Sequence, residues 1–137
     1  MSLLKIFDIA GSAMHAQSVR LSTTASNMAN ANSVSRDPED TYRAKLPVFA
    51  AVLNDMETGQ KAGGVEVKAV IDSQAPLRRE YAPSHPMADE TGYINLPNVN
   101  VVEELANMMS ASRSYQSNVE VFNTSKQLLQ RTLTLGK

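Results

Sequence analysis

The sequence contains no cysteine, no tryptophan and almost no net charge, and these deficits exclude several classes of function. Without cysteine there is no disulfide, no thiolate nucleophile and no cysteine-ligated metal, a composition that is compatible with an oxidising compartment. The 13 basic and 14 acidic residues give a formal net charge of −1, so no basic surplus is available to neutralise phosphates. We therefore expect no nucleic-acid partner.

Long apolar runs are also missing. No segment approaches the roughly 20 apolar residues of a membrane-spanning helix, so we expect no membrane-embedded part. The N-terminus lacks the pattern of a cleaved signal peptide, because Asp8 interrupts its short apolar stretch and Ala13 and Ala16 miss the spacing of a cleavage site. If the protein leaves the cytoplasm, we expect it to use a route without a cleaved signal.

Proline is absent from both flanks, since all six prolines lie between positions 38 and 97. Because proline interrupts helices, the sequence predicts a single α+β subunit with three parts. These are an N-terminal helix in 1–34, a β-rich, proline-containing middle segment in 35–97 and a C-terminal helix in 98–137. The strand candidates of the middle segment are Tyr42–Leu53 (broken at Pro47), Val65–Ile71, Leu77–Tyr81 and Tyr93–Leu96.

The C-terminal flank repeats with a period of seven residues. A fully apolar row consists of Val101, Met108, Tyr115, Phe122 and Leu129. A second, mostly apolar row follows it at a distance of four, with Leu105, Ser112, Val119, Lys126 and Leu133. This heptad pattern predicts a helix from about Val99 to Leu135, capped by Asn98 or Asn100 and stopped at Gly136.

The N-terminal flank has the same period but smaller side chains. Its apolar row consists of Phe7, Met14, Leu21 and Met28. The neighbouring positions are mostly small or polar, which lets another helix approach closely: Leu3, Leu4, Ala10, Gly11, Gln17, Ser18, Thr24 and Ala25. We expect the two long helices to pair as an antiparallel-type coiled coil.

The stretch TTASNMANANSV at the end of the first helix carries three amides and no charge. Asparagine is a poor residue for a helix interior, because its side chain competes for backbone groups. Buried amides can instead fix register between helices, so we predict that Asn27, Asn30 and Asn32 are contacts in an assembly. For Asn30 and Asn32, an ordinary role at a helix end or turn is the alternative.

Residues suited to catalysis or metal binding are sparse. His15 has no acidic, histidine or cysteine neighbour on its helical face. His85 precedes Pro86 and has Asp89 nearby in the sequence, but it is better explained as a turn histidine than as part of a metal or acid–base site. Glu103 and Glu104 are adjacent on a helix, so they do not face each other and are typical first-turn carboxylates. We expect no enzymatic activity, no cofactor and no metal site.

A helical hairpin packed on a small β-domain is one interpretation of this pattern. The first helix, however, has too few large apolar residues for one partner, and its remaining surface lacks the charges of a solvated face. Assembly with other helices explains both features. The subunit-interface candidates are Phe7, Met14, Arg20, Leu21, Asn27, Met28, Asn30, Val101, Leu105, Met108, Arg113, Tyr115, Val119, Phe122, Leu129 and Leu133.

Arginines beside these rows are candidates for ion pairs between subunits. Arg20, Arg113 and Arg131 are the cations, and the acidic candidates are Asp8, Glu103, Glu104 and Glu120. The alternative is that these charges are simply solvated and contribute little energy.

Two segments resemble a known family. HAQSVRLSTTASNMANANSV (15–34) and PNVNVVEELANMMSASRSYQSNVEVFNTSKQLLQRTLTLGK (97–137) are similar to the terminal segments of bacterial flagellar axial proteins, which build the rod and hook. YAPSHPMADETGYINLPNVNVVEE (81–104) narrows the resemblance to the short subunits of the proximal rod. One departure is that residues 33–41 intervene before Tyr42 and Arg43, where many axial proteins continue directly with a Thr-x-Gly-Tyr-Lys-type turn.

The resemblance implies a structural role outside the cytoplasm. Such a subunit would be exported unfolded by the flagellar type III apparatus, without a cleaved signal peptide. It would assemble helically in the periplasm, as part of the basal body, and carry torque from the inner-membrane ring to the distal rod and hook. Its partners would be itself, other rod subunits, the rod–ring adaptor and the inner-membrane ring protein.

Two other functions are compatible with the sequence. One is a different short flagellar rod subunit. The other belongs to a separate class, namely a β-module that binds cell wall or a protein ligand and uses the helices as a dimerising stalk. The second alternative requires helical termini in the isolated protein.

Overall fold

The computed structural model describes residues 3–52 and 63–135. Its elements, in chain order, are α1 (Leu3–Asn30), β1 (Lys45–Val52), β2 (Gly64–Asp72), β3 (Arg78–Tyr81), β4 (Tyr93–Leu96) and α2 (Val101–Leu135). Two long helices thus enclose a small antiparallel β region, which confirms the predicted α+β class and all four strand candidates. Gly136, the predicted helix stop, lies outside the described residues.

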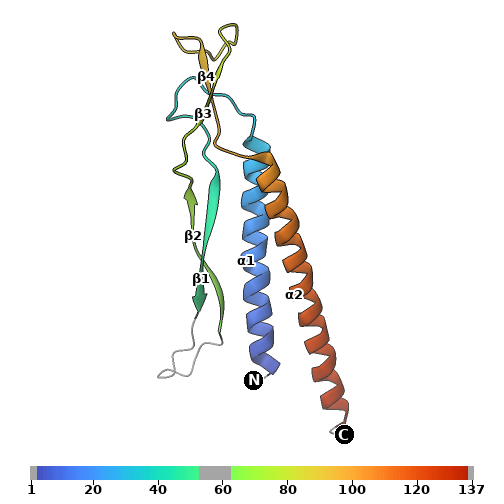
Figure 1. Cartoon of the computed structure of the whole chain (residues 1–137). Coiled ribbons are helices and arrows are strands. Elements are labelled where there is room, and N and C mark those ends of the chain that lie inside the picture. The colour runs from blue at the N-terminus through green and yellow to red at the C-terminus, as the bar shows by residue number, and fades with distance from the viewer. Residues whose placement is uncertain (1–2, 53–62, 136–137) are drawn as a thin grey trace.

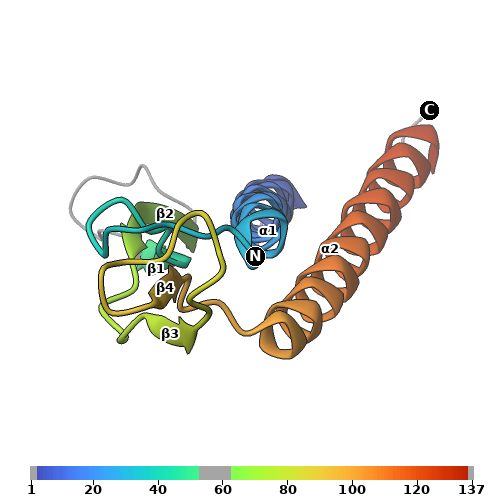
Figure 2. The ribbon, with the colours of Figure 1, turned by 90° about the horizontal axis from the view of Figure 1, so that it is seen from above.

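Helix α1 occupies the middle of the molecule, between the β1–β2 hairpin and α2 (Figure 1). The two helices run antiparallel, and the view from above shows that α2 is inclined to α1 (Figure 2). Helix α1 is thus covered on two sides, but the rest of its surface, which includes His15, Ser18, Ser22 and Ala29, is exposed. Burial within the subunit therefore does not account for the small number of charged residues on α1.

The β1–β2 hairpin is antiparallel, with a register that runs from Lys45 opposite Asp72 to Val52 opposite Gly64. The predicted break at Pro47 is wrong, since β1 continues through this residue and pairs it with Val70. In a two-stranded sheet, each strand is paired on one side only. Proline has no N–H group, and it is tolerated where its nitrogen faces the unpaired side, because no hydrogen bond between the strands is lost there.

The hairpin contacts α1 closely near Gly64. The Val65 N–H donates a hydrogen bond to the Ser12 hydroxyl oxygen of α1 at 3.2 Å. A Cβ atom on Gly64 would lie 2.7 Å from that oxygen, so a larger residue in this position would require the Ser12 side chain to move. Glycine is therefore favoured here by the approach of the Ser12 side chain rather than by its own dihedral angles.

Strands β3 and β4 form a second hairpin at the end of the molecule where α1 stops and α2 starts (Figure 1). Arg78 pairs with Leu96 and Tyr81 with Tyr93, and an isolated bridge joins Ser35 to Asn95. The bridge ties the chain that leaves α1 to the strand that leads into α2.

The start of α2 is capped by Asn100. Its side-chain oxygen accepts the Val102 N–H at 3.1 Å, and its backbone carbonyl accepts the Glu104 N–H at 2.9 Å. Asn98, the other cap candidate, instead accepts the Ala44 N–H at 2.8 Å and thereby fastens β1 to the segment before α2. The helix boundaries agree with the predicted ones within a few residues, as expected for capping signals.

The core is small and contains few large side chains. A buried cluster of Ala31, Ala44 and Val99, with Tyr42 against it, lies where α1, β1 and the start of α2 meet. Many of the large apolar side chains are exposed instead, mostly on the strands and α2. A surface of this kind is typical of a protein that has further contacts to make.

Candidate assembly interface

Three contacts define the antiparallel pairing of α1 and α2. The rings of Phe7 and Phe122 meet edge to face, with centroids 4.9 Å apart. Further along, the Arg20 guanidinium donates to the side-chain oxygen of Asn107 at 2.7 Å. The Asn27 amide then donates to Glu104 at 3.0 Å.

The surface of α2 toward α1 contains an unexpected row of residues. Glu104, Ala111, Asn118 and Ser125 are spaced by seven and are all buried or half-buried. The predicted second row is largely open, since Lys126 is exposed and Leu133 is 65% exposed. Within one chain, the predicted second row therefore does not form the seam between α1 and α2. Small and polar side chains at the seam let the two helices approach closely, whereas leucine would hold them apart.

Asn27 is a junction rather than a surface contact. It is 1% exposed, and its amide group makes four hydrogen bonds, which use both of its donors and both acceptor positions. The prediction that Asn27 contacts another subunit stays a prediction, but the polar atoms of its side chain are already satisfied inside the subunit. Asn30 ends α1 and donates to the Ser26 carbonyl of its own helix at 2.8 Å, which agrees with the helix-end alternative.

The other predicted interface residues fall into two groups. Half-buried within the subunit are Phe7, Met14, Arg20, Leu21, Met28, Met108, Val119, Phe122 and Leu129. Exposed are Val101, Leu105, Arg113, Tyr115 and Leu133. Within the described residues of one subunit, Arg20 binds Asn107, and its predicted ion pairs with acidic residues of other subunits stay a prediction. The ion pairs of the described residues are Lys45–Asp72 and Arg79–Asp89, neither of which was predicted.

The outward surface of α2 carries an apolar stripe formed by Val102, Leu105 and Met109, spaced by three and four residues along the helix. Val102 is 76% and Met109 68% exposed, the largest exposed fractions among the large apolar residues that the structure describes. We call these three residues the outer stripe. The sequence analysis did not identify Val102 and Met109, because they lie outside the two heptad rows. The dipeptides Val101-Val102 and Met108-Met109 could have identified them, since adjacent apolar residues lie on different faces of a helix.

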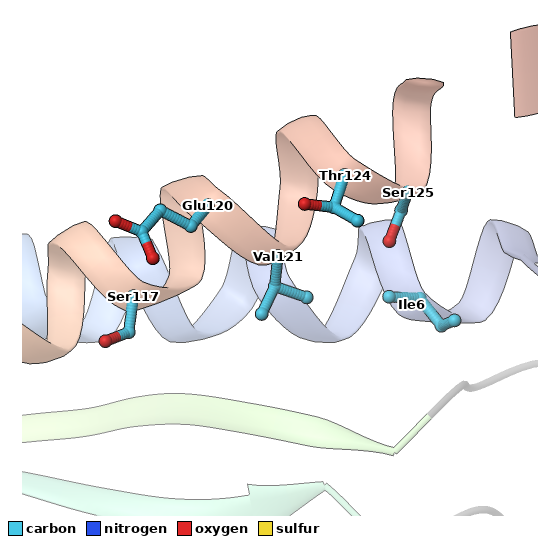
Figure 3. A pocket seen from close by; sticks show the side chains of 6 residues that line it. All are labelled: Ile6, Ser117, Glu120, Val121, Thr124 and Ser125. Carbon is cyan, nitrogen blue, oxygen red and sulfur yellow. The ribbon is translucent and has the colours of Figure 1, made fainter. Parts of the chain in front are cut away.

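A shallow groove of about 450 Å³ lies further along the helix pair (Figure 3). Ile6 of α1 forms one side, and the remaining side chains come from α2: Ser117, Glu120, Val121, Thr124 and Ser125. The groove combines apolar atoms with one carboxylate and several hydroxyls. It has no group of residues suited to bind a metal or activate a nucleophile.

The tip of the β3–β4 hairpin is ordered by Asp89. Its carboxylate accepts hydrogen bonds from the Thr91 hydroxyl at 2.6 Å and the Tyr93 N–H at 2.9 Å, and it pairs with Arg79 at 3.1 Å. His85 accepts the Met87 N–H through Nδ1 at 3.1 Å, which agrees with a turn histidine. Across the described ranges, no cluster of three or more acidic, histidine or cysteine residues is placed to hold a metal.

Asp89 provides a testable pH dependence. The Thr91 hydroxyl, followed by the Tyr93 N–H, lowers the pKa of this carboxyl from 3.8 to about 2. Because the folded-state pKa is depressed, Asp89 contributes fully to the stability of the tip above its unfolded pKa, and the contribution is lost as pH falls through about 2. We expect an NMR titration of the Asp89 carboxyl carbon to have its midpoint near 2.

Thr91→Val is the matched variant, because it removes the hydroxyl donor and keeps a branched side chain of similar size. We expect its Asp89 pKa to move up toward the ordinary value. A wild-type midpoint near the ordinary aspartate value, unchanged in Thr91→Val, would contradict the hydrogen-bond explanation.

Within the described ranges, neither helix combines the length and the apolar character that crossing a bilayer requires. Two family models match the chain at its helical parts. One is described as "Flagella basal body rod protein" and matches residues 7–36. The other, "Flagellar basal body rod FlgEFG protein C-terminal", matches residues 90–135.

Full-length relatives are similar along the entire chain. The flagellar basal-body rod protein FlgC of Salmonella typhimurium is 56% identical over 137 residues, with all of both chains covered. The FlgC protein of Yersinia enterocolitica is 55% identical, again over the whole of both chains. FlgC of Buchnera aphidicola from Acyrthosiphon pisum is 45% identical over 139 aligned positions and is also fully covered. The chain therefore belongs to the FlgC family of flagellar basal-body rod proteins, which are structural subunits and not enzymes.

Proposed function

We propose that the chain is a subunit of the proximal rod, that it assembles helically, and that it transmits torque from the inner-membrane ring to the distal rod and hook. The observation that carries this proposal is the outer stripe on α2, which has no partner within the described part of the chain. The stripe and the groove near Ile6 are different patches of one molecule. If the stripe of one copy meets the groove of the next, the contact is heterologous; such contacts generate an open helical assembly, as a rod requires, when the rotation between copies does not close into a ring.

We further propose that the subunit is exported unfolded by the type III apparatus, without a cleaved signal peptide, and acquires its final fold in the periplasm during assembly. The support is the composition of the helix seam, where alanine, serine and polar side chains replace most large apolar residues. Helices with so little apolar burial are marginal in isolation. Neighbouring subunits would supply the remaining burial, so that folding and assembly are coupled.

The proposed partners are further copies of the chain, other rod subunits, the rod–ring adaptor and the inner-membrane ring protein. The exposed candidates Val101, Leu105, Arg113, Tyr115 and Leu133 are available for these contacts, together with Val102 and Met109. Torque transmission requires contacts between subunits on several sides of each subunit, because a load carried by a single contact would break that contact.

The test is deletion of the gene for this chain in its own host, followed by reintroduction. We expect deleted cells to be non-motile, with basal bodies that retain the inner-membrane ring but lack a complete rod, and reintroduction to restore both. Motile deleted cells would overturn the proposal. Circular dichroism and amide NMR of the dilute purified chain should also show little stable helix, whereas a stable helical dimer would favour the stalked β-module.

A further inference from the structure

We propose that Asn27 is a positioning residue that couples two docking events, the packing of α2 on α1 and the packing of the β1–β2 hairpin on α1. The inference rests on the geometry of one buried amide and is independent of the proposed role in the rod, except for the cell assay described below. The amide lies on α1, close to the end of that helix, and it binds groups from both neighbouring layers.

Three of the four hydrogen bonds of Asn27 connect it to the hairpin side. Its oxygen accepts the Lys45 N–H at 2.7 Å and the Tyr42 hydroxyl at 2.9 Å. Its nitrogen donates to the Lys45 carbonyl at 3.0 Å. The first residue of β1 is thus bonded through both of its backbone groups to a single side chain, which fixes where the hairpin begins on α1.

The fourth hydrogen bond connects Asn27 to α2. The same nitrogen donates its second hydrogen to the Glu104 carboxylate at 3.0 Å. Glu104 is only 8% exposed, although it lies in the first turn of α2. A buried carboxylate that loses its donor is strongly destabilising, so the start of α2 is held opposite Asn27.

The two sides are coupled because an amide is planar and rigid. A rotation that follows a displaced Glu104 moves the oxygen away from Lys45 and Tyr42, and the reverse holds for a displaced hairpin. Water cannot replace the lost partners without entering a site where the side chain is 1% exposed. A slip of α2 by one heptad would bring Ala111 opposite Asn27 and leave the amide without an acceptor, so the junction also fixes register.

The experiment reverses the polarity of the bond to α2. Asn27→Asp keeps the shape and the acceptor for Lys45, but it places a carboxylate against Glu104 and against the Lys45 carbonyl. Glu104→Gln alone keeps an acceptor oxygen for Asn27 and should behave like wild type. In the double variant Asn27→Asp/Glu104→Gln, the glutamine amide can donate to the aspartate and restore the α2 contact. Asn30→Asp is the control, because this amide binds only its own helix.

The first readout is hydrogen exchange of the full chain, at a concentration at which the unaltered chain shows protected amides in α2 and β1. In Asn27→Asp we expect amides of both α2 and β1 to exchange about tenfold faster or more, since a buried group is left unpartnered. The double variant should recover protection in α2, and Asn30→Asp should match wild type. Loss of protection confined to α1, or a double variant no better than Asn27→Asp, would overturn the inference, since a role in packing alone predicts no such rescue.

The second readout is swimming of cells in which each variant is the sole copy, and it decides the case if the dilute chain shows no protected helix. We expect Glu104→Gln and Asn30→Asp to swim, Asn27→Asp to be severely impaired, and the double variant to swim better than Asn27→Asp but less well than Glu104→Gln, because its aspartate still faces the Lys45 carbonyl. Normal swimming of Asn27→Asp would overturn the coupling inference and leave the rod proposal standing. If the unaltered chain does not restore swimming, the rod proposal is contradicted. The coupling role of Asn27 is then tested by the hydrogen-exchange data alone.

Discussion

Replacing Met109 by aspartate is expected to abolish swimming while the subunit is still made and exported. Met109 is 68% exposed and is the last residue of the outer stripe along α2, so a carboxylate there is solvated in the free chain. In an assembly that covers the stripe, the same carboxylate would be buried without a partner, at a cost of roughly several kcal/mol per contact. Measured as swimming halos, we expect no expansion beyond that of a deletion strain.

Gln116→Asp is the matched control for Met109→Asp. It lies seven residues further along the same face of α2 and lines, together with Met109, a shallow depression separate from the groove near Ile6, but its side chain is already polar. We expect it to swim at a reduced or normal rate, with the same amount of protein in the periplasm as Met109→Asp. If Met109→Asp swims normally, the outer stripe is not an assembly contact.

Truncation of Phe122 to alanine is expected to destabilise the helix pair by about 2 kcal/mol. The rings of Phe122 and Phe7 meet edge to face, with centroids 4.9 Å apart, and form an aromatic contact between the two helices. The expected loss is below that for a fully buried phenylalanine, because Phe122 is only half-buried. Denaturant unfolding measures it, in the purified chain or in isolated basal bodies if the helices are ordered only there.

Val121→Ala provides the comparison for Phe122. Val121 is the preceding residue and is exposed beside the groove, so its truncation should change stability by less than about 0.5 kcal/mol. Equal losses in both variants would mean that α1 and α2 do not meet through the phenylalanine pair.

The three-part architecture was accessible from the sequence because it depends on local physics. Proline is excluded from helix interiors, so its confinement to positions 38–97 separates two helices from a β region without any knowledge of packing. The strand candidates were found for a similar reason, since β-branched and aromatic residues alternate there between turn signals. The strand was wrongly expected to break at Pro47, because which side of a strand stays unpaired depends on its pairing partner and cannot be known from the strand alone.

The identity of the seam row could not be obtained in this way. Heptad spacing shows which residues share a face, but not which face meets the partner helix, and leucine-rich rows attract attention first. Here Ala111 and Ser125 lie inside, while Leu105 and Leu133 are largely open. The hydrogen bond between Asn27 and Glu104 joins residues 77 positions apart, so no local pattern could have revealed that the amide is satisfied inside the subunit.

The polar composition of the seam has a thermal consequence. Exposure of apolar surface raises the heat capacity of unfolding and exposure of polar surface lowers it, so the row of Glu104, Asn118 and Ser125 makes the heat-capacity change on opening the seam smaller than a leucine row would, although the Phe7–Phe122 pair still adds to it. The strength of the seam therefore varies less with temperature than that of a fully apolar contact. Contacts made through Val102, Leu105 and Met109 are apolar and weaken on cooling. In a rod built through the outer stripe, cold would separate neighbouring subunits before it separated the two helices of one subunit.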